Sequence, residues 1–115
     1  MLFQFYETSE GKDLVYQELM SIKQEKLREL VKKKLAYYEE KEFNQFTRGR
    51  DLEKIKRTDL WELKIRTSPP HRALCFLIDL SQMLVLHLFQ KGDGPIDGSD
   101  IDIAMYRLKD YKIRK

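Results

Sequence analysis

The sequence predicts an α+β fold in which an N-terminal strand and a helical hairpin pack on a mostly antiparallel four-stranded sheet, followed by a C-terminal helix. Three observations predict it. The chain opens with a short apolar, aromatic run, two amphipathic stretches follow within the first 40 residues, and three strand-like runs with short links fill residues 60–91. Helices grouped before such a meander are typical of α+β proteins. At 115 residues, the chain has the usual length of one domain.

The first 40 residues predict one strand and two helices. Residues 2–6 are apolar and aromatic, which favours a strand. Hydroxyl side chains just before residue 11 can cap a helix over residues 11–20. A serine and a glutamine with capping-box spacing can start a second helix over residues 21–40, where apolar residues recur at three- and four-residue steps. Almost no linker separates the two helices, as in a helical hairpin.

Two further segments connect the predicted elements. Residues 43–59 follow no periodic pattern and are basic, so they predict a loop with one helical turn near Leu52 and Ile55. Connections of this length are often functional or mobile. Glycines and a proline mark a second loop after residue 91, and Ser99 can then cap the last helix.

The predicted strands carry an unusual set of cations. Apolar and charged residues alternate along residues 60–66, which places Lys64 and Arg66 on one face of the strand. The next strand starts with Arg72 and is apolar on both faces, so we expect it to be central and covered. A third strand ends in Lys91. Cations mounted rigidly on a sheet predict an anionic partner.

Composition and charge narrow the class of protein. The formal net charge is +3, with 22 Lys and Arg against 19 Asp and Glu, which alone does not indicate a polyanionic partner. Residues 107–115 hold five cations and one acidic residue, typical of a solvated tail or of a phosphate-contacting surface. No apolar run approaches the ~20 residues of a membrane span. Without a signal-peptide pattern, and with Cys75 inside an apolar strand, we expect a cytoplasmic protein without a membrane partner.

Few catalytic motifs are present. The two histidines, His71 and His87, and the one cysteine lack metal-ligand spacing, so we expect neither a metal nor another cofactor. No glycine-rich phosphate loop or nucleophile-elbow motif occurs. A basic cleft beside histidines and tyrosines could nevertheless cleave RNA. The 2′-hydroxyl attacks the adjacent phosphorus, a base takes its proton, fixed cations stabilise the growing charge, and an acid protonates the leaving 5′ oxygen.

Four segments resemble the RelE/ParE toxin superfamily, and most closely its HigB-like branch. They are a Leu-Trp-Glu-Leu-Lys-Ile strand at residues 60–65, the His71-Arg72 start of the next strand, the His87, Phe89 and Lys91 pattern of the third strand, and the Ala104, Arg107, Asp110 and Tyr111 pattern of the last helix. The resemblance covers nearly the whole chain as one domain, residues 1–115, and residues 43–57 match least.

The resemblance implies the toxin of a type II toxin–antitoxin pair with a RelE-like fold. Such a toxin is a metal-independent endoribonuclease that cleaves mRNA on the ribosome and arrests growth. Its partners are the ribosome, mRNA and a small helix-turn-helix antitoxin similar to HigA, through which alone it would reach operator DNA. The residues carried over as catalytic are Lys64, Arg66, Arg72, Lys91 and His87. Those expected to contact RNA are His71, Arg107, Lys109 and Tyr111.

The sequence also departs from the branch. Gly92 and Asp93 follow Lys91 where the branch usually continues with Lys and Thr, His71 replaces a common tyrosine, and Leu88 replaces a glycine. These changes leave the general acid and base open.

Other roles and another function class remain open as well. Arg72 could form a salt bridge with Glu62, and His87 could be a core histidine. The alternative function is a non-catalytic binder of the same fold, such as a ParE-like gyrase inhibitor or a phage regulatory protein.

Overall fold

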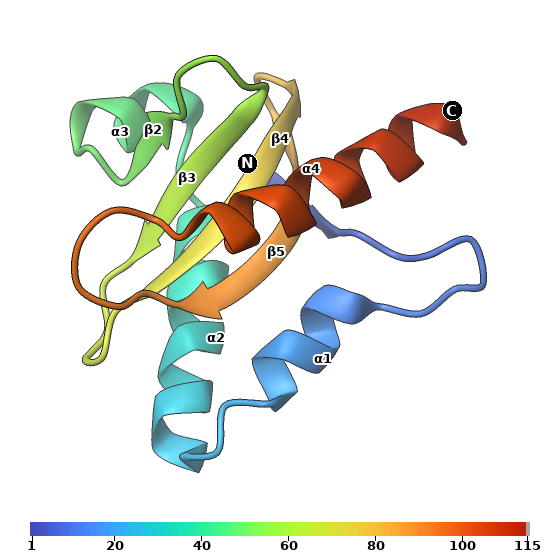
Figure 1. Ribbon diagram of the computed structural model, residues 1–115. Coiled ribbons are helices and arrows are strands. Elements are labelled where there is room, and N and C mark those ends of the chain that lie inside the picture. Colours follow the sequence, from blue (N-terminus) through green and yellow to red (C-terminus); the bar gives the residue numbers. More distant parts are fainter. Residues whose placement is uncertain (115) are drawn as a thin grey trace.

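The computed structural model describes residues 1–114 and confirms the α+β fold, with one sheet between helices (Figure 1). Along the chain, the elements are β1 (Leu2–Phe5), α1 (Leu14–Met20), α2 (Glu25–Glu39), α3 (Phe43–Arg48), β2 (Leu52–Lys54), β3 (Leu60–Ile65), β4 (His71–Asp79), β5 (Gln82–Gln90) and α4 (Gly98–Ile113). Lys115, the last residue of the basic C-terminus, lies outside the described residues.

The sheet has five strands in the order β1-β5-β4-β3-β2. Strand β1 is parallel to β5, and the other neighbours are antiparallel, so the sheet is mostly antiparallel as predicted. The four expected strands are joined by a fifth, β2, at the edge. The helical turn predicted near Leu52 is wrong, because Leu52 lies in β2 and pairs with Leu63. Three residues are too few for a strand to show its alternation in the sequence.

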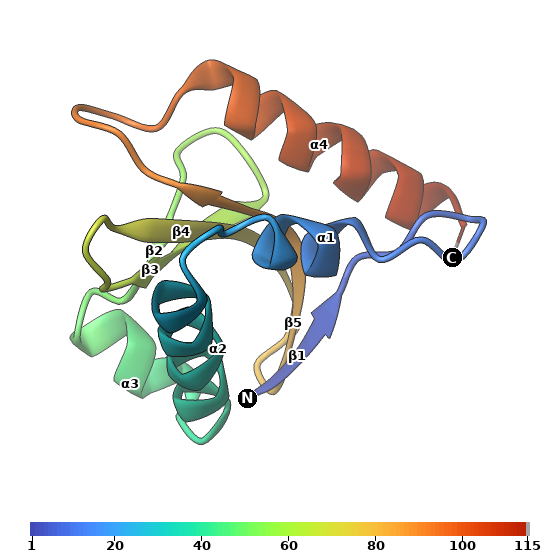
Figure 2. The same ribbon diagram turned by 90° about the horizontal axis from the view of Figure 1, so that it is seen from below.

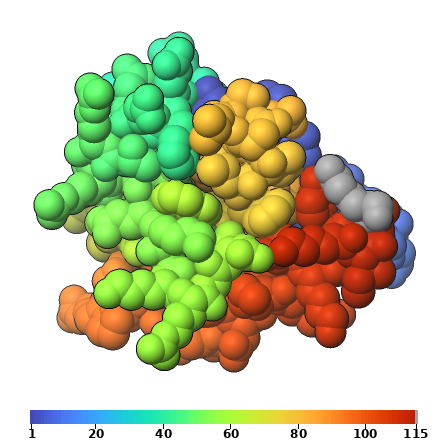
Figure 3. Space-filling model, turned by 90° about the horizontal axis from the view of Figure 1, so that it is seen from above, coloured from blue at the N-terminus to red at the C-terminus, as the bar shows by residue number. Residues whose placement is uncertain are grey.

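The helices cover both faces of the sheet (Figure 2). Helices α2 and α3 lie on one face, here called the α2 face, and α4 crosses the opposite face, the α4 face. Helix α1 packs along β5. Viewed from above, the β2–β3 connection, the β4–β5 turn and the C-terminal part of α4 lie side by side (Figure 3). An ion pair of 3.0 Å between Lys112 Nζ and Asp59 Oδ2 links α4 to that connection.

Helix α1 begins later than the sequence predicts. Gly11 has a φ of +83°, in the left-handed region, which is incompatible with a helix over residue 11. The helix instead starts after Asp13, whose Oδ1 accepts a hydrogen bond of 2.8 Å from the Tyr16 amide. Asp97 caps α4 in the same way, through the Ser99 amide at 3.0 Å, so Ser99 is not the cap.

The core on the α2 face is built around aromatic side chains. Phe46 of α3 is fully buried, with its ring centroid 5.4 Å from that of Tyr38 and 6.4 Å from that of Phe3. The Tyr38 hydroxyl donates a 2.9 Å hydrogen bond to the carbonyl of Lys64. Segment 43–48, predicted as loop, is therefore a helix that contributes an anchor to the core.

On the α4 face, a row of apolar side chains crosses the sheet. Leu60, Phe76 and Leu84 are cross-strand neighbours beneath α4, which buries Ala104 and Leu108. Among residues 1–114, no helix is both long enough and apolar enough to span a bilayer.

Replacing Phe46 by Ala tests whether α3 belongs to the core. Removing a buried phenylalanine costs about 3–5 kcal/mol in the free energy of unfolding, because the contacts are lost and a cavity remains. Urea denaturation measures the loss. Tyr106→Ala is the control, since that ring is 74% exposed, and it should change the free energy by less than about 0.5 kcal/mol. A loss below about 1 kcal/mol for Phe46→Ala would contradict the packing.

Candidate functional site

Two of the predicted catalytic cations, Lys64 and Arg72, lie together on the α4 face, and Arg66 follows at the end of β3. Lys64 of β3 is directly opposite Arg72 of β4, and Arg72 is opposite Phe89 of β5. Arg66 lies one residue beyond the end of β3, and its side chain is paired with Asp51, which directly precedes β2. We call Lys64, Arg66 and Arg72 the cation cluster. Antiparallel pairing of β3 with β4 brings it together.

Each cation of the cluster is paired with a carboxylate. The pairs are Lys64 with Glu53, Arg66 Nε with Asp51 Oδ1 at 3.0 Å, and Arg72 Nε with Glu62 Oε2 at 2.8 Å. The alternative salt bridge of Arg72 is therefore present. Asp51 also forms an ion pair of 3.7 Å with Lys41, so four cations share these three carboxylates and most of their charge is compensated. The carboxylates fix where the cationic groups point.

The arginines of the cluster retain hydrogen-bond donors. The Arg66 side chain is 56% exposed, and neither of its terminal nitrogens has a partner within residues 1–114. Arg72 is 14% exposed, and its Nη1 donates to the His71 carbonyl at 3.0 Å, leaving Nη2 unbonded within the same residues. The hydrogen bond from Lys64, and then its charge, lowers the pKa of Glu53. The cluster can therefore offer an anion oriented N–H groups.

Lys91 is held apart from the cluster by its own loop. Its backbone N–H donates to the Pro70 carbonyl at 2.9 Å. Its ammonium group donates to the carbonyl of Gly92 at 3.3 Å and to that of Gly94. Gly92, which departs from the family pattern, and Gly94 thus supply carbonyl partners for this lysine.

His87 is buried between two carboxylates. Its Nδ1 lies 2.6 Å from Glu18 Oε2 and its Nε2 lies 2.8 Å from Asp100 Oδ1, while its ring stacks on Phe89 at 4.9 Å. Burial favours a lower pKa, but the hydrogen bonds to Glu18 and Asp100 outweigh it and raise the pKa of His87. With both nitrogens donating to carboxylates, the ring links α1, β5 and α4.

The predicted RNA contacts on α4 lie in different surroundings. Arg107 Nη1 donates to Glu18 Oε2 at 3.0 Å and to the Leu86 carbonyl at 2.8 Å, where the β4–β5 register shifts. Lys109 is exposed, and the partly buried Tyr111 ring lies 6.5 Å from Phe76. Residues 107–113 are thus helix rather than a free tail. Their contacts with RNA stay predictions.

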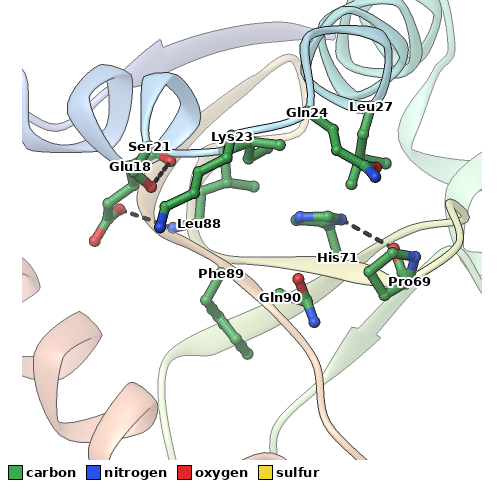
Figure 4. A pocket seen from close by; sticks show the side chains of 11 residues that line it. Glu18, Ser21, Lys23, Gln24, Leu27, Pro69, His71, Leu88, Phe89 and Gln90 are labelled. Atoms are coloured by element: carbon green, nitrogen blue, oxygen red, sulfur yellow. Dashed lines mark hydrogen bonds between the residues drawn. The ribbon is translucent and has the colours of Figure 1, made fainter.

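His71 lies on the other side of the sheet from its neighbour Arg72. It is 2% exposed, and its Nδ1 lies 3.1 Å from the Pro69 carbonyl and 2.9 Å from Thr67 Oγ1. Burial lowers the pKa of His71, which the hydrogen bond to Pro69 only partly opposes. The ring lines a cavity near the start of α2 (Figure 4).

Three carboxylates of the site, Asp51, Glu53 and Glu18, were not revealed by the sequence, whereas Glu62 was considered as a partner of Arg72. Asp51 and Glu53 fall in the segment predicted as loop, and only the pairing of β2 with β3 brings them to the cluster. Glu18, which lies on a helix 69 positions before His87, forms a hydrogen bond with it. One signal for these carboxylates was the alternation of acidic, apolar and acidic residues at Asp51, Leu52 and Glu53. Within residues 1–114, no three His, Cys, Asp or Glu side chains are grouped so as to hold a metal ion.

Comparison with known protein families gives one match. Residues 17–109 match the family described as phage derived protein Gp49-like (DUF891). The chain belongs to this family. The Gp49-like family is part of the RelE/HigB-type superfamily of toxin–antitoxin toxins, many of which are endoribonucleases. The comparison with curated proteins finds no match.

The Gp49-like family assignment agrees with the fold and with the segments that suggested the superfamily. The match covers most of the chain, from α1 to the C-terminal part of α4, and includes the cation cluster. Membership in a superfamily of toxin–antitoxin toxins also suggests an antitoxin partner.

The buried His87 should make stability depend on pH in a defined direction. Its pKa is raised in the folded chain, so its contacts stabilise the fold below the unfolded pKa of about 6.5, and this contribution is lost as the pH rises through the folded pKa. His87→Gln should therefore lower the free energy of unfolding most at pH 6, and the difference from wild type should narrow toward pH 9. Urea denaturation across this range measures it.

His71 provides an internal control of opposite sign. Its pKa is lowered by folding, so its contribution is present above the unfolded pKa and is lost as the pH falls. The difference in the free energy of unfolding between wild type and His71→Gln should become smaller as the pH falls from 7 to 5. A difference for His87→Gln that stays constant or grows toward pH 9 would contradict the two-carboxylate environment.

Proposed function

We propose that this protein is the toxin of a type II toxin–antitoxin pair, of the HigB-like branch, and that it cleaves mRNA on the ribosome without a metal ion. The observation that carries the proposal is the cation cluster, in which Lys64 and Arg72 are cross-strand partners and Arg66 adds exposed guanidinium nitrogens. Cations fixed in place before the reaction stabilise charge that develops in a transition state.

The role of each residue in the cluster follows from which of its N–H donors have no protein partner. Arg66 and Arg72 donate to the non-bridging oxygens of the scissile phosphate through the nitrogens that have no protein partner. Lys64 adds charge between them, and the three carboxylates hold the cations in position. We assign His87 a positioning role, because both of its nitrogens are occupied. Lys91 joins the site only if its loop releases the ammonium group.

The pairing of the cluster's cations with carboxylates supports dependence on the ribosome. Affinity for free RNA comes mainly from uncompensated cations that displace counterions from phosphates. Here each cation has a carboxylate beside it, and the whole chain carries only +3. Weak attraction to free RNA follows, so a ribosome that presents the mRNA would supply the positioning. The growth arrest would be relieved by a small helix-turn-helix antitoxin encoded next to the toxin.

The alternative is a non-catalytic binder, such as a gyrase inhibitor. The same ion pairs favour it, because cations fully occupied by carboxylates also serve as structural links between strands. The two functions differ in what happens to mRNA, which makes them separable by experiment.

Expression of wild type and Arg72 variants, with mapping of mRNA 5′ ends, tests the proposal. Wild type should halt growth and create new 5′ ends within translated frames. Arg72→Ala should lower their rate of appearance by about 100-fold or more, because one charged donor to the reacting phosphate is lost. Arg72→Lys keeps a cation beside Glu62. It therefore distinguishes the loss of the arginine's donor from the effect of leaving Glu62 without a cation.

Arg48→Ala is the matched control, since Arg48 is exposed on α3, away from the cluster. It should cleave like wild type. Growth arrest by wild type without new 5′ ends would overturn the nuclease assignment, and normal translation with a loss of DNA supercoiling would identify the gyrase inhibitor instead.

A further inference from the structure

A cavity of about 460 Å³ lies between the α1–α2 connection and the adjoining ends of β4 and β5 (Figure 4). Its walls are mostly apolar, with Ile22 and Leu27 on the helical side and Pro69 and Leu88 on the sheet side. Polar ends project among them from Lys23, Gln24, His71 and Gln90. The cavity has the size and the mixture of walls of a small-ligand site.

His71 presents an unused acceptor to this cavity. The Pro69 carbonyl can only accept, so Nδ1 is the nitrogen that carries the proton and donates to it. Nε2 then holds a lone pair and has no partner within residues 1–114, although the residue is 98% buried (its exposed fraction is 2%). Figure 4 shows the ring with this nitrogen turned away from Pro69, into the cavity. No described side-chain nitrogen or oxygen is both buried and without a partner, so Nε2 is accessible at the surface of the cavity, where a ligand can donate to it.

The side-chain amides of two glutamines add further hydrogen-bonding groups to the cavity wall. The Gln24 and Gln90 side chains line the cavity and make no hydrogen bond within residues 1–114, so each offers a donor and an acceptor. Gln24 is the N-cap position of α2, yet its side chain does not cap the helix. It is therefore free to turn toward a ligand. The exposed Lys23 adds one cation at the rim.

We propose that this cavity binds one unpaired nucleobase of an RNA strand. A base is flat and apolar on its faces and carries N–H donors and acceptors along its edge, which matches apolar walls with amide groups and a neutral histidine acceptor. The cavity lies at the same end of β4 and β5 as the cation cluster but opens on the opposite face of the sheet: Gln90 is the cross-strand partner of His71, and Phe89, which also lines the cavity, is the partner of Arg72. A strand whose phosphate lies on the cluster would pass around this end of the sheet to place a nearby base in the cavity.

The inference rests on the proposed RNA substrate, but its test needs no cleavage. The chain has only two histidines, so ¹⁵N-histidine labelling gives a simple imidazole spectrum. The probes are AMP, CMP, GMP and UMP, each added to about 10 mM because single bases bind in the millimolar range. At least one of them should shift the His71 Nε2 resonance. His87 should not move, since both its nitrogens are already bonded.

Variants locate the effect in the cavity. Gln24→Ala should weaken binding about five-fold, through the loss of neutral hydrogen bonds. Leu27→Trp, which fills the space, should abolish the shift. Gln17→Ala is the matched control, an exposed glutamine of α1 outside the cavity, and it should bind like wild type. An unchanged His87 signal in every variant reports that the fold is intact.

The outcomes separate the two proposals. No shift of His71 with any nucleotide, or equal shifts in Leu27→Trp, would overturn the nucleobase site. A His71 signal that responds to the antitoxin and to no nucleotide would also overturn it, in favour of a peptide side chain. If nucleotides bind and Leu27→Trp blocks them while wild type cuts no mRNA in cells, the nucleobase site stands and the nuclease proposal fails.

Discussion

The register between β3 and β4 is the constraint on which both sites depend. Leu63 and Ile65 are fully buried on the α2 face, opposite Ala73 and His71, and this burial fixes the pairing. Since side chains alternate along a strand, Lys64 and Arg72 must then meet on the α4 face. The consecutive residues His71 and Arg72 serve opposite faces for the same reason. If the register slipped by one residue, the cationic side chains would face the core and the apolar side chains would face the α4 side.

The ion pairs of the cation cluster orient its cations but weaken their attraction for an anion. The carboxylates of Asp51, Glu53 and Glu62 fix the cationic groups but cancel most of their field. Partly buried ion pairs of this kind add little to stability, because the cost of removing charges from water offsets their attraction. Their value lies in geometry, which agrees with our proposal that the ribosome presents the mRNA to this site. Glu18 does the same for His87 and Arg107, joining α1 to β5 and α4.

The sequence predicted the central strands and the cations on them, because alternation over residues 60–66 reports one buried face directly. It missed β2, whose three residues are too short to show a period, and with it Asp51 and Glu53, two of the three carboxylates that pair with the cluster. It placed the start of α1 too early, since only the φ of Gly11 shows that the chain turns there. It did not reveal Glu18 and Asp100 as the partners of His87, because both are distant in sequence, and the catalytic role of His87 stays a prediction.

The central claim is that fixed cations promote attack by a 2′-hydroxyl on an RNA phosphate. The most direct measurement uses ribosomes programmed with an mRNA that carries a single 2′-deoxynucleotide at the mapped cleavage position. Purified protein should cut the all-ribose mRNA there and leave the substituted one intact at that position, because the nucleophile is missing. Equal cleavage of both messages would contradict it, since the attacking oxygen would then come from elsewhere.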